Sequence, residues 1–233
     1  MRNLARAIVL LLALGLSEPV LAGPLEDARA AYGKEDYTTA LRLFRPLADQ
    51  GDADAQSMLG LMYDNGQGVP KDDAQAVKWY RLAANQGYAW AQTSLGTMYD
   101  NGQGVPKDYA QAVKWYRLAA NQGYASAQFN LGFMYSKGEG VPKDYAQAVK
   151  WYRLAANQGY ASAQANLGNM YYLGQGVPKD YVLAYMWRNL AAGGASDADI
   201  RERAVKARDE LAKVMTSAQV AEAQKRASAW QPK

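Results

Sequence analysis

The sequence has no cysteine and no histidine among its 233 residues. Without cysteine it has no disulfide, no thiolate nucleophile and no cysteine-based metal site. Without histidine it lacks the commonest imidazole metal ligand, the usual general base and the usual partner of a catalytic serine. The Ser-x-x-Lys and Gly-x-Ser-x-Gly patterns of activated serines are also missing. We therefore predict that the protein is not an enzyme and that it uses no cofactor and no metal.

The chain also has little excess charge. Its 26 basic and 22 acidic residues give a formal net charge of +4, and no run of Lys or Arg tracks the spacing of a phosphate backbone. This balance does not favour nucleic acid as a partner. A hydrophobic fraction of 49% and a charged fraction of 21% are ordinary for a folded soluble protein.

The N-terminus has the pattern of an export signal. Arg2 and Arg6 precede an apolar stretch over Ala7–Leu16. A short tail then ends in Val20-Leu21-Ala22, with small residues where a signal peptidase needs them. We predict a signal peptide over residues 1–22, cleaved after Ala22, and a periplasmic or secreted protein. The apolar stretch is shorter than the ~20 residues that span a bilayer. A retained anchor is therefore the weaker alternative, and we expect no membrane span once the signal is removed.

One sequence segment recurs along the chain. The letters VPKDYAQAVKWYRLAANQGYA run from Val105 to Ala125 and again from Val141 to Ala161, and a third copy from Val69 differs only at Asp73. Self-alignment gives four units of 36 residues, called units one to four: 52–87, 88–123, 124–159 and 160–195. Units of this length cannot bury an apolar face alone and typically stack into a solenoid.

Each unit predicts two helices, called helix A and helix B. In unit one, Ala55, Leu59 and Met62 repeat with a helical period, and Gly66 ends that helix. Asp72 is a natural N-cap for helix B, and Gln75, three residues later, predicts a capping box.

A glycine inside every helix A predicts close approach of a bulky ring. Glycine costs about 1 kcal/mol relative to alanine in a helix interior, so its presence at Gly60, Gly96, Gly132 and Gly168 implies a compensating contact. The predicted partners of these glycines are the tryptophans of helix B: Trp79, Trp115, Trp151 and Trp187.

The pattern A-Q-x-x-L-G-x-M-Y-x-x-G-x-G-V-x-K-D-x-x-x-A-x-x-W-x-x-x-A-A-x-x-G resembles the Sel1-like repeat, a relative of the tetratricopeptide repeat. The resemblance implies an all-α fold, a right-handed α/α solenoid of stacked antiparallel helix pairs. Residues 23–51 resemble one more, atypical pair, with Asp36 at the N-cap position. Residues 196–233 predict a C-terminal helical cap and tail, or alternatively a separate partner-binding helix.

The fourth unit departs from the standard letters in helix B. We interpret this departure as the join to the C-terminal segment, and the substituted residues are Val182, Leu183, Tyr185, Met186 and Arg188.

Four positions of helix A differ between units and lie on one helix face. Stacking aligns these faces, and the resemblance implies that they form the concave wall through which tetratricopeptide domains touch extended peptides. We predict a ligand-binding groove made of Asp54, Ser57, Leu61, Asp64, Trp90, Thr93, Thr97, Asp100, Ser126, Phe129, Phe133, Ser136, Ser162, Ala165, Asn169 and Tyr172.

The large residues of this set separate two interpretations. Variation alone is also what unrestrained drift on a solvated face produces. Trp90, Phe129, Phe133 and Tyr172 instead predict uncovered aromatic anchors. The strongest competing prediction is that Phe129 or Phe133 packs against a neighbouring unit.

Two functions are compatible with these features. The first is a non-enzymatic scaffold or adaptor in the bacterial cell envelope, monomeric, which holds a protein or peptide of unknown identity along the concave face. The second is binding or hydrolysis of cell-wall material, because some cysteine-rich relatives are described as binding or weakly hydrolysing β-lactams. The lack of every cysteine in this chain separates it from those relatives.

Overall fold

A computed structural model describes residues 23–232, so the predicted signal peptide lies outside the described residues. This part of the chain is all-helical, without a strand. None of its helices combines the length and the apolar character needed to cross a bilayer. The helices are α1 (Pro24–Gly33), α2 (Tyr37–Asp49), α3 (Ala53–Asn65), α4 (Asp73–Asn85), α5 (Ala89–Asn101), α6 (Tyr109–Asn121), α7 (Ala125–Lys137), α8 (Tyr145–Asn157), α9 (Ala161–Leu173), α10 (Tyr181–Gly194), α11 (Ala198–Ala212) and α12 (Ser217–Ala229).

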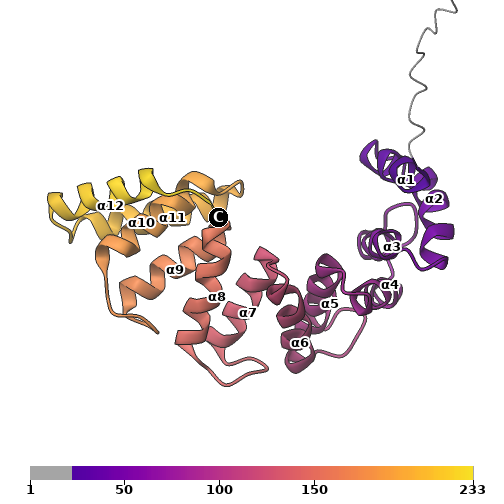
Figure 1. The fold of residues 1–233 in the computed structure, drawn as a ribbon, viewed down its shortest axis with the longest axis horizontal. Coiled ribbons are helices and arrows are strands. Elements are labelled where there is room, and N and C mark those ends of the chain that lie inside the picture. The colour runs from indigo at the N-terminus through magenta and orange to yellow at the C-terminus, as the bar shows by residue number, and fades with distance from the viewer. Residues whose placement is uncertain (1–22, 233) are drawn as a thin grey trace, which may run out of the picture.

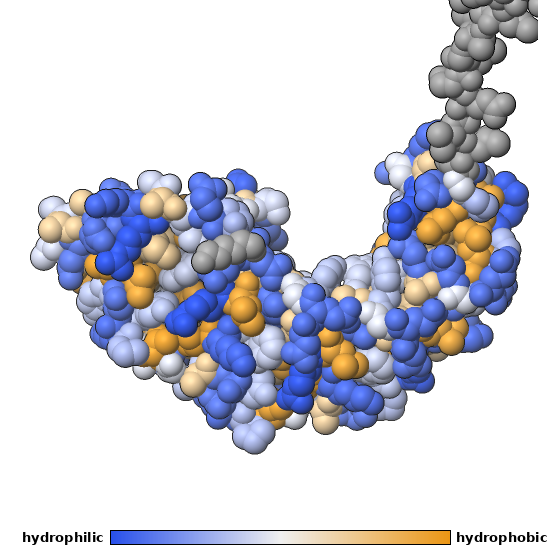
Figure 2. Space-filling model, viewed as in Figure 1, coloured by the Kyte–Doolittle hydropathy of each residue, from blue (hydrophilic) through white to orange (hydrophobic). Residues whose placement is uncertain are grey.

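The helices stack as consecutive pairs and confirm the predicted α-solenoid. Helix A and helix B of units one to four are α3 and α4, α5 and α6, α7 and α8, and α9 and α10, and each helix packs on its sequence neighbour. The array curves into an arc (Figure 1), and the space-filling view shows a hollow between its two ends (Figure 2). Helices α11 and α12 both pack on α10 and close the C-terminal end.

Aspartates start the B helices as predicted. The carboxylates of Asp72, Asp108 and Asp144 each accept a hydrogen bond from the backbone N–H three residues later. At Asp72 the predicted capping box is incomplete, because the Gln75 side chain does not return a bond to the Asp72 backbone. Within residues 23–232 the reciprocal pair occurs at Thr216 of α12, which bonds with Gln219 in both directions.

Tyrosine, not tryptophan, covers the glycine of each standard helix A. A Cβ built on Gly60 would lie 2.5 Å from Cδ1 of Tyr80. Cβ atoms built on Gly96 and Gly132 would lie 2.7 Å and 2.9 Å from Cδ1 of Tyr116 and Tyr152, respectively. The prediction of Trp79, Trp115, Trp151 and Trp187 as partners was therefore wrong. Each tyrosine ring crosses helix A of its own unit where no side chain intervenes.

The tryptophans instead join one unit to the preceding one. Trp79 belongs to the apolar cluster of α1, α2 and α3 and lies under the Arg45 guanidinium, with 5.4 Å between Cζ and the ring centroid. Trp115 joins the cluster that contains Tyr80 and Leu95. Adjacent residues of helix B thus face different neighbours, since successive helical positions differ by about 100°.

Buried glutamines form a second set of contacts between units. The Nε2 atoms of Gln56, Gln92 and Gln128 donate to backbone oxygens at the end of the preceding helix B over 3.1–3.2 Å. Their Oε1 atoms accept from Gln86, Gln122 and Gln158 over 2.8 Å. In unit four, Gly194 stands at the position of the donors Gln86, Gln122 and Gln158. The Oε1 atom of Gln164 is therefore buried without a hydrogen-bond partner.

The glycines of the A–B loop also have a packing reason. Gly104 has φ +66° and lies directly on the backbone carbonyl of Asp73 in the first turn of α4, where a Cβ would overlap that carbonyl. Gly140 and Gly176 lie in the same way on the backbone of Tyr109 and Tyr145. Each loop therefore rests on the start of helix B in the preceding unit.

Gly96→Ala is expected to destabilise the protein by about 1–3 kcal/mol, because its Cβ would overlap the Tyr116 ring and force one of the two helices to shift. The matched control is Gly193→Ala, at a helical glycine with no neighbouring atom within 4 Å. The control is expected to gain about 0.5–1 kcal/mol from helix propensity. Urea denaturation followed by circular dichroism measures both, and equal shifts of the two variants would contradict the tyrosine contact.

Gly194→Gln is expected to raise the free energy of unfolding by about 1–2 kcal/mol. The new side chain would supply the donor missing at Gln164 Oε1 in addition to the gain in helix propensity. Gly193→Gln receives only the propensity gain. A melting temperature that rises equally in both variants would show that the glutamine contact adds nothing.

Candidate functional site

The sixteen predicted groove residues lie on helices α3, α5, α7 and α9, but not all are accessible. Ser57 is 1% exposed, and its hydroxyl donates to the Asp54 carbonyl over 3.0 Å. Thr93 is 8% exposed and donates to the Ala89 carbonyl over 2.9 Å. These two hydroxyls serve their own helices, so both residues are removed from the predicted groove.

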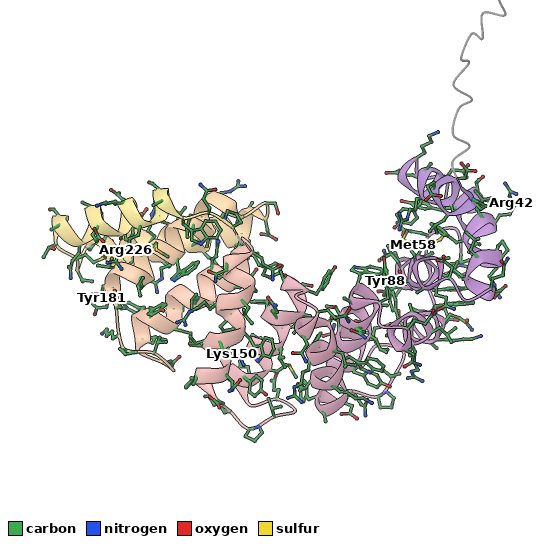
Figure 3. The ribbon with its side chains drawn as sticks, viewed as in Figure 1. Arg42, Met58, Tyr88, Lys150, Tyr181 and Arg226 are labelled. Carbon is green, nitrogen blue, oxygen red and sulfur yellow. The ribbon has the colours of Figure 1, made fainter. Side chains whose placement is uncertain are left out.

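The acidic residue of α3 is occupied by contacts within the chain. Asp54 forms a salt bridge with Arg29, at 2.5 Å between Oδ2 and Nη2. The same carboxylate accepts a hydrogen bond from the Tyr88 hydroxyl over 2.7 Å. Tyr88 lies where α3, α4 and α5 meet (Figure 3). Asp54 therefore connects α1 to the first two standard units and is not a free ligand for a partner.

The tyrosines that cover the glycines reach the variable positions with their hydroxyls. Tyr116 Oη lies 3.2 Å from Thr97 Oγ1 and Tyr152 Oη lies 3.4 Å from Ser136 Oγ. Burial raises the pKa of Tyr116 and of Tyr152, so both hydroxyls stay protonated. In units two and three the same geometry thus brings one hydroxyl from helix B to the variable face of helix A.

The aromatic residues of the predicted groove divide into covered and uncovered ones. Trp90 packs edge-on against Tyr80, with 5.6 Å between ring centroids. Phe129 lies against Tyr152 and against Tyr160 of the following unit, at 5.8 Å and 5.3 Å. For Phe129 the competing prediction of packing between units is therefore confirmed.

Phe133 and Tyr172 remain accessible. Each is 36% exposed. Lys137 Nζ lies 5.4 Å from the centroid of Phe133, and the Arg188 guanidinium carbon lies 4.7 Å from that of Tyr172. These two residues keep the property that the aromatic-anchor prediction requires.

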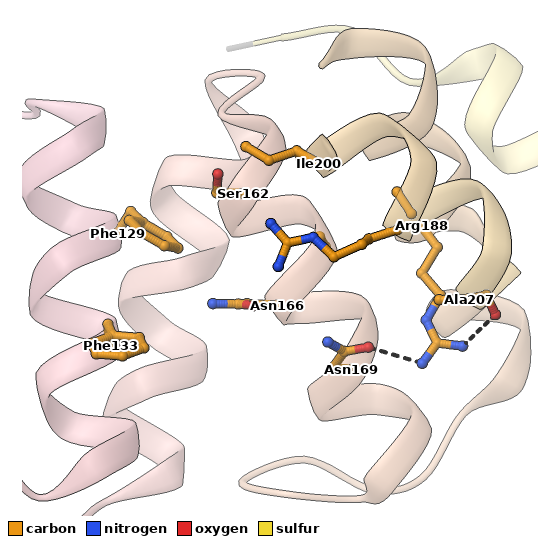
Figure 4. Close-up of a pocket in the computed structure, with 11 residues that line it drawn as sticks. Phe129, Phe133, Ser162, Asn166, Asn169, Arg188, Ile200 and Ala207 are labelled. Atoms are coloured by element: carbon orange, nitrogen blue, oxygen red, sulfur yellow. Dashed lines mark hydrogen bonds between the residues drawn. The ribbon is translucent and has the colours of Figure 1, made fainter. Parts of the chain in front are cut away.

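A pocket of about 330 Å³ lies at the C-terminal end of the variable face. Five predicted groove residues line it: Phe129, Phe133, Ser162, Ala165 and Asn169. Figure 4 shows the two phenylalanines on α7 opposite Arg188, Ile200 and Ala207, with Asn166 and Asn169 between them. The phenylalanines of α7 thus form an apolar wall. The asparagines of α9 and Arg188 of α10 supply polar groups, and α11 forms the opposite wall.

Sequence reasoning missed six lining residues. They are Asn166 of α9, Arg188 of α10, and Ile200, Arg203, Ala204 and Ala207 of α11. The signal for Arg188 was present, because it is one of the letters by which unit four departs from the repeat. The contribution of α11 had no signal, because that helix lies outside the repeat pattern and its docking is tertiary.

The polar side chains that line this pocket are two arginines, two asparagines and a serine. Within residues 23–232, His, Cys, Asp and Glu nowhere gather in threes around a point that could hold a metal ion. The pocket itself offers guanidinium and carboxamide groups beside aromatic rings. Such groups orient a ligand through hydrogen bonds and apolar contact.

Comparisons with known proteins agree with this architecture. The sequence profile of the Sel1 repeat matches residues 29–52, 53–88, 91–124, 125–160 and 161–193. A crystal structure of a Sel1 repeat protein from Oxalobacter formigenes is 34% identical, with a TM-score of 0.68 over 83% of this chain and 86% of that one.

A second similar solved structure is of a longer chain, which this chain matches over about half of its length. It is c5321, a protective antigen present in uropathogenic Escherichia coli strains and displaying an SLR fold. It is 32% identical, with a TM-score of 0.58 over 89% of this chain and 52% of that one. A comparison with curated proteins finds no match.

The free energy of unfolding of the Asp100→Ser variant, relative to that of the wild type, is expected to increase as the pH rises from about 4 to 7. Burial raises the pKa of Asp100, and the Glu139 carboxylate raises it further against the opposing Lys107. Since the folded-state pKa exceeds the unfolded one, the wild type loses stability as this carboxyl ionises, whereas serine, the residue found at position 136, does not titrate. Denaturation curves across that pH range test this, and a pH-independent difference would contradict it.

Proposed function

Because the chain belongs to the Sel1 repeat family, whose members generally serve as scaffolds for protein interaction, we propose that it binds a protein or peptide segment along its concave face. The remaining accessible groove residues of α7 and α9 contact the segment, and the protein performs no catalysis. The signal pattern of residues 1–22 supports export, so we propose the bacterial cell envelope as its location.

One observation carries this proposal. Variable residues from two successive A helices line a single pocket together with residues of α11, which follows the last repeat unit. Exposed Phe133 and half-buried Phe129 give this pocket an apolar wall. Aromatic anchors surrounded by adaptable polar groups are what a peptide-binding surface requires.

The exposed leucines of helix B offer a contrast. The repeated letters of helix B place Leu82, Leu118 and Leu154 at about 40% exposure each. They are alike in every standard unit, as expected for a surface set by the repeat itself. The variable face of helix A differs from unit to unit, and that difference supports this face as the surface that selects a partner.

Photo-crosslinking in intact bacteria tests the binding face. A p-benzoylphenylalanine at position 133 is expected to form adducts with an envelope protein, whereas the same probe at Lys150, an exposed position of α8, is expected to form none. Adducts at both positions, or only at 150, would contradict the concave-face assignment. Nitrocefin turnover above the buffer rate by the purified protein would contradict the absence of catalysis.

Export is tested by the mature N-terminus. Expressed with its own leader, the protein is expected in the periplasmic or culture fraction with an N-terminal sequence that starts at Gly23, because Val20 and Ala22 are the small residues of a cleavage site. Replacing Leu11 and Leu12 by Asp is expected to keep it in the cytoplasm with its first residues intact. An unprocessed wild type would contradict the proposal.

A further inference from the structure

The pocket contains an arginine at the place where the standard units have a tyrosine. Arg188 of α10 occupies the position of Tyr80, Tyr116 and Tyr152, and it covers the helix-A glycine in the same way. A Cβ built on Gly168 would lie 2.9 Å from Arg188 Cγ. The stem therefore crosses α9 as the tyrosine rings cross their own A helices, and the guanidinium emerges on the variable face.

The charge of Arg188 has no acidic partner among residues 23–232. The residue is 6% exposed. Its Nη2 donates to Asn169 Oδ1 and its Nη1 to the Ala207 carbonyl, each over 2.9 Å, and both acceptors are neutral (Figure 4). Nε is buried and has no hydrogen-bond partner.

A buried cation without a counter-ion is unfavourable. Buried charges are normally paired, because moving an ion out of water costs several kcal/mol. A guanidinium offers five N–H donors in a planar fork, and the described contacts of Arg188 use two of them. Among the described residues the charge of Arg188 is therefore met only by the face of the Tyr172 ring, 4.7 Å from Cζ, and part of its donor capacity stays unused.

The other residues of the pocket indicate which chemical groups of a partner would fit it. Arg203 of α11 adds a second positive charge, although it is paired with Asp199 and mostly exposed. Asn166 adds a carboxamide, and Phe129 and Phe133 form the apolar wall. No aspartate or glutamate lines the pocket. The complement of these groups is an anionic group next to an apolar one.

We propose, building on the peptide-binding function above, that this pocket receives a carboxylate of the bound peptide at Arg188, with a neighbouring apolar side chain against Phe129 and Phe133. A carboxylate is planar and accepts two parallel N–H bonds from a guanidinium. The carboxylate belongs to an Asp or Glu side chain or to the C-terminus of the peptide, which share this chemistry.

Two random peptide libraries displayed on phage, one with blocked and one with free C-termini, identify the source. The purified protein is expected to enrich peptides with Asp or Glu beside an apolar residue from the first library, or a free terminus after an apolar residue from the second. Resynthesised peptides in which the carboxylate is replaced by an amide are expected to bind at least about tenfold more weakly in fluorescence anisotropy.

Arg188→Met provides the decisive comparison. Methionine keeps an unbranched stem over Gly168 but removes the charge, so acid and amide peptides are expected to bind this variant equally. The matched control Lys150→Met removes one positive charge from α8 and is expected to keep the full discrimination. If Arg188→Met does not fold by circular dichroism, Arg188→Lys replaces it, and its discrimination is expected to fall between the two.

The outcomes separate this inference from the function on which it rests. Enriched peptides without a carboxylate, or discrimination that persists in Arg188→Met, would overturn the carboxylate site and leave peptide binding intact. If neither library yields a peptide that binds the wild type more tightly than a Phe133→Ser variant, both the inference and the proposed function fail.

Discussion

The contact between a tyrosine of helix B and a glycine of helix A determines the geometry of every standard unit. Glycine at positions 60, 96 and 132 lets the rings of Tyr80, Tyr116 and Tyr152 cross helix A at contact distance. The rings are buried, and burial of one such aromatic side chain far outweighs the intrinsic cost of a helical glycine. In units two and three the same crossing carries the tyrosine hydroxyl to the variable face, so packing and part of the polar character of that face come from one interaction.

Contacts between units use different residues of the same helices. Trp79 and Trp115 pack on the preceding unit. Each buried glutamine, such as Gln56 at the start of α3, bonds to the end of the preceding helix B and to a glutamine at the end of the helix B of its own unit. The loop glycines rest on the first turn of the preceding helix B. Since each of these contacts repeats at the same spacing, the relative placement of neighbouring units repeats as well, and a regular arc follows.

Local signals made most of this fold predictable. Periodic apolar residues and capping aspartates such as Asp72 mark helix starts, and Gly66 marks a helix end, through interactions within a few residues. The partner of Gly60 was not predictable in this way. Trp79 and Tyr80 are adjacent and both bulky, and which of them faces its own helix A depends on how two helices dock. The burial of Ser57 and the docking of α11 over Ser162 depend on tertiary contacts for the same reason.

Unit four shows what the end of the array permits. An internal unit must fit a unit on both sides, so its inner residues are constrained to the common letters. Helix α10 instead meets α11 and α12, and it departs from the repeat at Arg188, which replaces a tyrosine, and at Gly194, which replaces a glutamine. Helix α11 supplies the second wall of the pocket. Freed from the need to match a following repeat, this end combines the glycine crossing of the standard unit with a charged side chain. The buried arginine of the pocket therefore occupies its place through the same geometry that packs every other unit.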